Sequence, residues 1–142
     1  MIVLDTDIIS LLDRGNGEAF ENLAKRFVQI PADEPVCTTV ISLEEHMRGW
    51  LGQIATARQP AAQVIAYYRL QRLVDEYSLR VVLPFDDAAS AVFISLRRQR
   101  IRIGTMDLRI AAIVLSRDAL LISRNVRDFK RVPHLRVEDW TC

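Results

Sequence analysis

The sequence is poor in the residues that mark several large classes of protein. Its two cysteines, Cys37 and Cys142, are too few and too far apart for a zinc motif, and they fit a reduced, cytoplasmic setting. Only five glycines and five prolines occur in a chain that is 50% hydrophobic, which argues against disorder. No apolar run approaches the roughly 20 residues of a membrane span, and no signal peptide is evident. We therefore expect one globular domain over residues 1–142 that is not membrane-bound.

The chain also lacks the short motifs of several enzyme classes. It contains no P-loop, no G-x-G-x-x-G and no G-x-S-x-G sequence. Its only histidines are His46, which is expected on a helix surface, and His134, which is expected in a solvated turn next to a proline. Catalysis in this chain is therefore expected to depend on carboxylates.

The net charge of +1 hides an uneven distribution along the chain. Residues 97–136 contain eleven Lys or Arg and three acids, whereas residues 1–96 contain eight basic residues and thirteen acids. A basic region beside carboxylates suits a polyanion held against metal ions. The alternative is that the arginines only cover helix faces, and charge alone favours that alternative.

Short apolar runs alternate with amphipathic segments along the whole chain. Apolar and β-branched runs predict strands over 2–4, 36–41, 81–83, 119–122 and 135–137. Helical spacing of apolar residues predicts helices that include 8–12, 18–30, 42–51, 60–77, 87–96 and 105–115. The order β-α-α-β-α-α-β-α-α-β-α-β predicts an α/β three-layer sandwich with a mainly parallel sheet.

Three carboxylates follow predicted strands or open predicted helices. Asp5 follows the first strand, Glu45 follows the second by a few residues, and Asp107 lies in the first turn of a helix. Each has a simple role as a helix cap or first-turn acid, since Asp5 can cap directly and Ser42 with Glu45 matches a capping box. Thr105 can likewise cap the helix that contains Asp107. Because parallel strands bring their carboxyl ends to one edge of a sheet, the three acids are nevertheless expected to meet.

A cluster of carboxylates requires compensation for its charge. Neighbouring carboxylates raise one another's pKa values, and a bound divalent cation removes that cost. Ligation by carboxylate and water oxygens is what Mg²⁺ and Mn²⁺ prefer. Such an ion makes hydroxide from water and neutralises charge on a phosphodiester. The residues thus predict metal-dependent hydrolysis of a phosphodiester.

Four segments resemble the motifs of PIN-domain ribonucleases, and in particular the VapC-type toxins of bacterial toxin–antitoxin pairs. They occur in order along the whole chain, at Leu4–Asp7, Ile41–Gly49, Ile103–Ala112 and Ile122–Trp140. The resemblance implies a PIN-like α/β/α sandwich and a Mg²⁺- or Mn²⁺-dependent endoribonuclease. It also implies an RNA substrate, a cognate VapB-type antitoxin and a homodimer.

The resemblance assigns roles to individual residues. Asp5, Glu45 and Asp107 match the three acidic positions of the family and are expected to bind the metal. Glu45 is also expected to orient the attacking water. The fourth catalytic position is Asn125 by its spacing after the strand, with Asp128 as the competing choice. An asparagine cannot supply a negative charge there, although its amide oxygen can hold a metal-bound water.

Further residues have supporting roles in this reading. Thr6, Ser42 and Ser123 are expected as caps and hydrogen-bond donors to the metal ligands. Phosphate contacts are expected from basic residues near the site, namely Arg98, Arg102, Arg124 and Arg127.

The helices over 43–50 and 64–77 carry more apolar surface than one core contact requires, including Trp50, Leu51, Tyr67 and Tyr68. These residues are expected either to receive an antitoxin helix or to pack in the protein's own core or a homodimer interface.

Two other functions fit parts of the sequence. Asp5-Thr6-Asp7 resembles the D-x-D of aspartate-nucleophile phosphatases, but the Gly-Thr that should follow it and a clear catalytic lysine are absent. A non-catalytic RNA- or protein-binding module with the same fold is the second alternative, and the complete acidic set argues against it.

Overall fold

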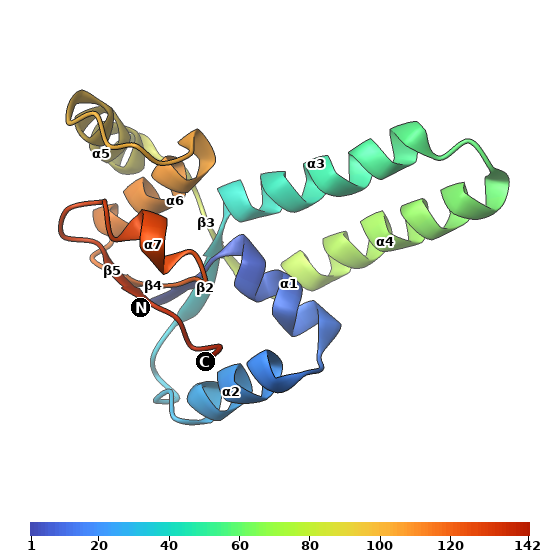
Figure 1. The fold of residues 1–142 in the computed structure, drawn as a ribbon, viewed down its shortest axis with the longest axis horizontal. Helices are drawn as coiled ribbons and strands as arrows, with labels where there is room; N and C mark the ends of the chain where they lie inside the picture. The colour runs from blue at the N-terminus through green and yellow to red at the C-terminus, as the bar shows by residue number, and fades with distance from the viewer.

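The five strands and seven helices follow one another in the predicted order (Figure 1). A computed structural model describes residues 1–142. The strands are β1 (Ile2–Leu4), β2 (Val36–Thr39), β3 (Val81–Leu83), β4 (Leu120–Ile122) and β5 (Arg136–Glu138). The helices are α1 (Thr6–Arg14), α2 (Glu18–Val28), α3 (Val40–Thr56), α4 (Pro60–Ser78), α5 (Asp87–Arg98), α6 (Thr105–Ser116) and α7 (Val126–Phe129).

The strands form one sheet in the order β3-β2-β1-β4-β5, and every pair is parallel. Strand β1 is central, with Val3 paired to Cys37 on one side and to Leu121 on the other. The strand order reverses at β1 and β4, because the chain adds β2 and β3 on one side and β4 and β5 on the other. In open parallel sheets, ligands bind at this switch point, beyond the carboxyl ends of the strands.

Side chains alternate between two cores along the strands. Val3 and Leu121 pack with α5 and α6 on one face of the sheet. Ile2, Leu4 and Ile122 pack on the other face, with α1, α2 and the end of α4. Helices therefore cover both faces of a parallel sheet (Figure 1), which confirms the predicted three-layer α/β sandwich.

Helices α3 and α4 form a long antiparallel hairpin that extends away from the sheet (Figure 1). Because the hairpin stands clear of the sheet, few residues of α4 are buried, namely Ala66, Leu73 and Tyr77. The apolar residues of this helix are therefore divided into a few that are buried and many that are exposed. Many of its other large apolar residues are exposed, namely Val64, Ile65, Tyr67, Tyr68 and Val74.

The start of α3 differs from the prediction. The expected strand runs to Ile41 and the expected helix starts at Ser42, but β2 ends at Thr39 and α3 begins at Val40. Thr39 is the N-cap, and its Oγ1 accepts a hydrogen bond from the Ser42 backbone N–H at 3.1 Å. The capping box with Ser42 at the N-cap is therefore wrong, and Glu45 lies in the second turn of α3.

Two further helix ends differ in the same way. Helix α3 continues to Thr56, several residues beyond the expected end near Leu51. Helix α6 has Gly104 as its N-cap with no side-chain hydrogen bond, so the expected cap by Thr105 is wrong.

None of the seven helices combines the length and the apolar composition that a membrane span requires.

The outer strands of the sheet are short, and β5 bears charged residues. In β3, Val81 is exposed and Pro84 follows the strand directly. In β5, Arg136 pairs with Asp118, and Glu138 pairs with Arg26 of α2.

Candidate active site

Asp5 is the buried centre of a polar cluster at the switch point of the sheet. It follows β1 directly, caps α1, and retains only 6% of its accessible surface. Its Oδ1 accepts a hydrogen bond from the Thr6 backbone N–H at 2.8 Å, and its Oδ2 accepts one from Ser123 Oγ at 2.6 Å. Asp5 is thus both the helix cap and the link between the ends of β1 and β4.

Burial sets the electrostatics of this carboxyl group. Loss of hydration raises the pKa of Asp5 to about 7, against the hydrogen bonds from Ser123 and Thr6. The charges of Asp7 and Asp107 act in the same direction as burial. A carboxylate in this state lacks a positive partner, and a bound cation would supply one.

Asp107 reaches the same place from the start of α6. Asn125, just after β4, donates from Nδ2 to Asp107 Oδ2 at 3.2 Å. Burial raises the pKa of Asp107, and the charge of Asp128 raises it further, whereas the hydrogen bond from Asn125 lowers it. The structure therefore places Asn125 in contact with Asp107.

Asp128 lies near this cluster without a hydrogen bond to it. Its carboxylate is 3.8 Å from Arg131 of the same short segment. Its effect on Asp107 is that of a neighbouring negative charge.

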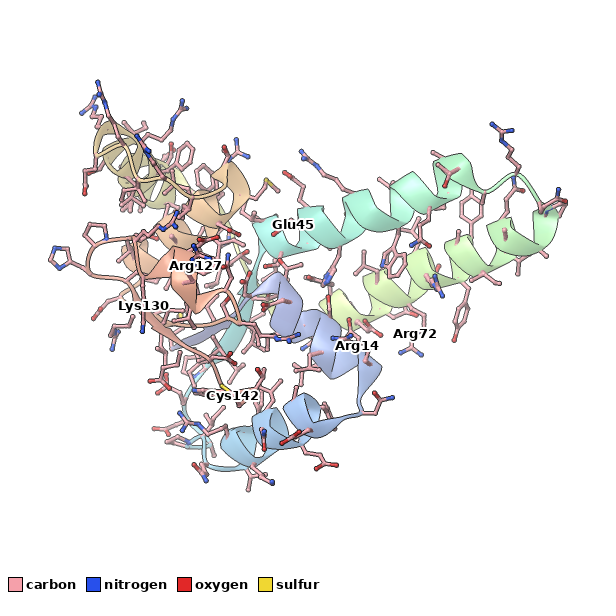
Figure 2. All side chains as sticks on the ribbon, in the orientation of Figure 1. Arg14, Glu45, Arg72, Arg127, Lys130 and Cys142 are labelled. Carbon is pink, nitrogen blue, oxygen red and sulfur yellow. The ribbon has the colours of Figure 1, made fainter.

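Glu45 enters from α3 (Figure 2). Its Oε1 accepts a hydrogen bond from Thr6 Oγ1 at 2.9 Å. Burial raises the pKa of Glu45, and the charges of Asp107, Glu44 and Asp7 add to that rise, against the hydrogen bond from Thr6. Asp107 therefore lies close enough to both Asp5 and Glu45 for its charge to raise their pKa values.

The supporting polar residues are only partly as expected. Thr6 and Ser123 donate to Glu45 and Asp5 respectively, as the sequence predicts. Ser42 does not contact a carboxylate, because its hydroxyl is buried 3.2 Å from Thr39 Oγ1 at the helix start.

Asp7 is a member of the cluster that sequence reasoning left outside the site. Its Oδ2 accepts the Arg124 backbone N–H at 3.0 Å, and its Oδ1 is buried without a partner. Burial raises the pKa of Asp7. The only sequence signal was its position two residues after Asp5, which also fits a first-turn acid.

The two histidines lie outside the carboxylate cluster. His134 is exposed, as expected. His46 is half-buried and both of its ring nitrogens are hydrogen-bonded, so its predicted place on a helix surface is wrong.

The cluster fits a hydrated divalent ion better than a closed metal cage. No three Asp, Glu, His or Cys side chains lie close enough together to enclose an ion by themselves. Mg²⁺ usually binds through one or two carboxylates and keeps several of its waters. Asp5 and Asp107 offer such oxygens, and the buried Asp7 Oδ1 has no hydrogen-bond donor.

The chain has relatives, in sequence and in structure, that match it over its whole length. No family model matches it. It is 28% identical over 139 residues to ribonuclease VapC1 of Haemophilus influenzae, which covers 98% of this chain and 97% of that protein. It is 38% identical over 64 residues to the tRNA(fMet)-specific endonuclease VapC of Shigella flexneri, which covers 42% and 48% of the two chains. Among solved structures, it superposes on a chain of the VapBC-1 complex from nontypeable Haemophilus influenzae with a TM-score of 0.76, 27% identity and full coverage of both chains.

Proposed function

We propose that this chain, which belongs to the VapC-type PIN-domain proteins, is a cytoplasmic endoribonuclease that hydrolyses RNA phosphodiester bonds. The observation that supports the proposal most directly is that Asp107 lies close enough to Asp5 and to Glu45 to raise both of their pKa values, at the switch point of the sheet. The proteins named ribonuclease VapC1 and tRNA(fMet)-specific endonuclease VapC support it, since both are similar to this chain.

Asp5 and Asp107 would hold a Mg²⁺ ion, or Mn²⁺ in its place, with Glu45 binding it directly or through water. When bound, the ion supplies charge neutralisation at the phosphodiester and lowers the pKa of a water. Ser123 and Asn125 keep Asp5 and Asp107 in fixed orientations through their hydrogen bonds.

Glu45 is suited to orient the attacking water and to accept its proton. Thr6 occupies one of its carboxylate oxygens, which leaves the other free to face a water. Burial raises the pKa of Glu45 and so increases its basicity above that of an exposed glutamate.

RNA would approach over the connection between α5 and α6 and over α7. Arg98, Arg102 and Arg127 are exposed and form no ion pair. Arg131 donates to the Arg102 backbone carbonyl at 2.7 Å, which joins the connection to the end of α7. Figure 2 shows Arg127 and Lys130 on this side of the molecule, away from the tip of the α3–α4 hairpin. Exposed guanidinium groups without an ion-pair partner suit RNA phosphates.

The partner is a VapB-type antitoxin, since the matching structures include VapBC complexes from Haemophilus influenzae and Rickettsia felis. A cavity of about 690 Å³ between α1, α3 and α4 is a suitable place for an antitoxin helix. Trp50 and Tyr68 line it, and Tyr68 is 63% exposed. A homodimer would leave this cavity open if it forms through another helical face.

Metal removal is the test of this function. The purified chain should cleave RNA with Mg²⁺ or Mn²⁺, lose cleavage with EDTA, and regain it when either metal is returned. Zn²⁺ should not be required.

Two substitutions test the acids themselves. Glu45→Gln and Asp107→Asn should stay folded and lose turnover by orders of magnitude, because each removes a charge and little volume. Full cleavage by metal-free protein, or by either variant, would contradict the proposed site.

A further inference from the structure

A second polar cluster lies behind the carboxylates, where α1, α3 and α4 meet. It contains one residue from each helix, namely Ser10, His46 and Tyr77. His46 Nε2 lies 2.8 Å from Ser10 Oγ, and His46 Nδ1 lies 2.7 Å from the Tyr77 hydroxyl. Both ring nitrogens are engaged, so neither is available to an RNA substrate.

The hydrogen bonds of this cluster join α1, α3 and α4. Ser10 Oγ lies 3.0 Å from the Thr6 backbone carbonyl, to which it can donate, and 2.8 Å from His46 Nε2. On the other edge of the ring, His46 Nδ1 lies 2.7 Å from the Tyr77 hydroxyl, so the imidazole is held from both sides.

Thr6 connects this chain of hydrogen bonds to the carboxylates. Its backbone N–H donates to Asp5, and its hydroxyl donates to Glu45. His46 follows Glu45 directly on α3. A shift or rotation of α3 that breaks the contact between His46 and Ser10 would therefore also move Glu45 relative to Thr6.

We infer that His46 is a positioning residue, which bonds to Ser10 of α1 and Tyr77 of α4 at once and thereby fixes α3 with Glu45 facing Thr6. This inference rests on the proposed ribonuclease function and deepens it. An imidazole suits the role because its ring presents a donor and an acceptor on opposite edges. Leucine at this position would fill the space but leave the two hydroxyls without their partner.

A purely structural role for His46 makes a different prediction. If the cluster only joins the three helices, its loss would lower the unfolding temperature and leave each folded molecule fully active. If His46 positions Glu45, a folded variant would have a lower kcat and a weaker affinity for the metal, because a small displacement of a catalytic group is costly.

The experiment compares His46→Leu, His46→Gln and Ser10→Ala in the full chain, at a temperature where circular dichroism shows each variant folded. We expect His46→Leu to lower kcat by about 10- to 100-fold, with the KM for RNA unchanged and the Kd for Mn²⁺ raised. Ser10→Ala should change kcat and Kd in the same direction. Glutamine carries a donor and an acceptor on one amide, so His46→Gln should recover most of the activity. His134→Leu, at the exposed histidine, is the matched control and should behave as wild type.

The inference is wrong if folded Ser10→Ala and His46→Leu both keep the wild-type kcat and Mn²⁺ affinity. Ser10→Ala removes a single oxygen and decides the matter alone if His46→Leu does not fold. Failure of the proposed function would give a different result, because the wild-type chain itself would then not cleave RNA with Mg²⁺. The Mn²⁺ affinities of the variants would still test the positioning role in that case.

Discussion

Asp5 shows how one residue combines a structural role with a chemical one. As an N-cap it stabilises α1 through the Thr6 backbone N–H, a role that needs only an oxygen. As a buried acid with two acidic neighbours, it is destabilised in its charged form, and its pKa is raised to about 7. The cap and the candidate metal ligand are thus the same atoms, held in one conformation by Ser123.

In the metal-free protein, the cost of the charged Asp5 carboxylate should appear as a pH dependence of the free energy of unfolding. An unfolded chain loses the Asp5 proton near pH 4, whereas burial lets the folded chain keep it until about pH 7. Between these values the folded state binds more protons, so its stability falls as the pH rises. Asp5→Asn removes this loss, which is on the order of a few kcal/mol at most.

We therefore expect Asp5→Asn to raise the unfolding temperature in EDTA more at pH 8 than at pH 5, while abolishing RNA cleavage. Thermal unfolding of both proteins at the two pH values measures the difference. An equal change at both pH values would show that Asp5 is not a strained carboxylate.

The fourth site residue can be assigned by comparing Asn125→Ala with Asp128→Ala. The first removes a hydrogen bond that lowers the pKa of Asp107, and the second removes a charge that raises it. We expect Asn125→Ala to weaken Mn²⁺ binding and to lower kcat by about tenfold or more. Asp128→Ala should leave Mn²⁺ binding equal or tighter. Isothermal titration with Mn²⁺ separates the two, and weaker binding in Asp128→Ala alone would identify Asp128 as the ligand.

Among the elements, the α5–α6 connection and α7 carry the basic residues expected to hold RNA. Each lost phosphate contact lowers the slope of log affinity against log salt by about 0.7 for a single strand. We expect the double variant Arg98→Ala, Arg102→Ala to raise the KM several-fold and to reduce this slope by about 1.4. Lys25→Ala with Arg58→Ala, in α2 and the α3–α4 turn, is a charge-matched control and should leave both unchanged. Equal effects of the two pairs would show that the RNA has no preferred path.

The elements themselves were largely predictable, because periodic apolar residues determine which segments are helices and which are strands. The β-branched Val40 and Ile41 look like the end of a strand, yet the hydroxyl of Thr39 starts the helix there. Sequence periodicity also could not show that the α3–α4 hairpin stands clear of the sheet. The apolar residues of α4 therefore fitted a partner surface and a packed core equally well, and the structure leaves Val64 69% exposed.

The acidic residues of the site could be predicted from the sequence, but their hydrogen-bonded partners could not. Asp5 was visible because an apolar strand ends abruptly at it. The contacts of Asn125 with Asp107 and of Asp7 with Arg124 join residues far apart in the chain. The same is true of His46 with Ser10, and no local pattern identifies such pairs.

At the scale of the whole molecule, the open cavity between α1, α3 and α4 predicts how the antitoxin is held. A charged Tyr68→Glu should weaken the complex with the antitoxin, because the ring is exposed on the cavity wall. RNA cleavage by the free protein should persist, since Tyr68 takes no part in the hydrogen bonds of Asp5, Glu45 or Asp107. Co-expression with the antitoxin should restore growth to cells that make the wild-type protein, and less so to those that make the variant.

Val28→Glu is the control for that variant, since Val28 is an exposed apolar residue of α2 outside the cavity. Titration of each purified protein with the antitoxin gives the affinities. Normal antitoxin binding by Tyr68→Glu, or equal weakening in Val28→Glu, would place the antitoxin elsewhere.

The short outer strands have a consequence for self-association. Three-residue edges, with Pro84 after one and paired charges along the other, offer little continuous backbone for another sheet to extend. Growth of one chain onto the next by strand addition is therefore disfavoured, which protects the protein from fibrillar aggregation. A dimer is therefore expected to form through helices, with a geometry set by side-chain packing rather than by a shared ladder of main-chain bonds.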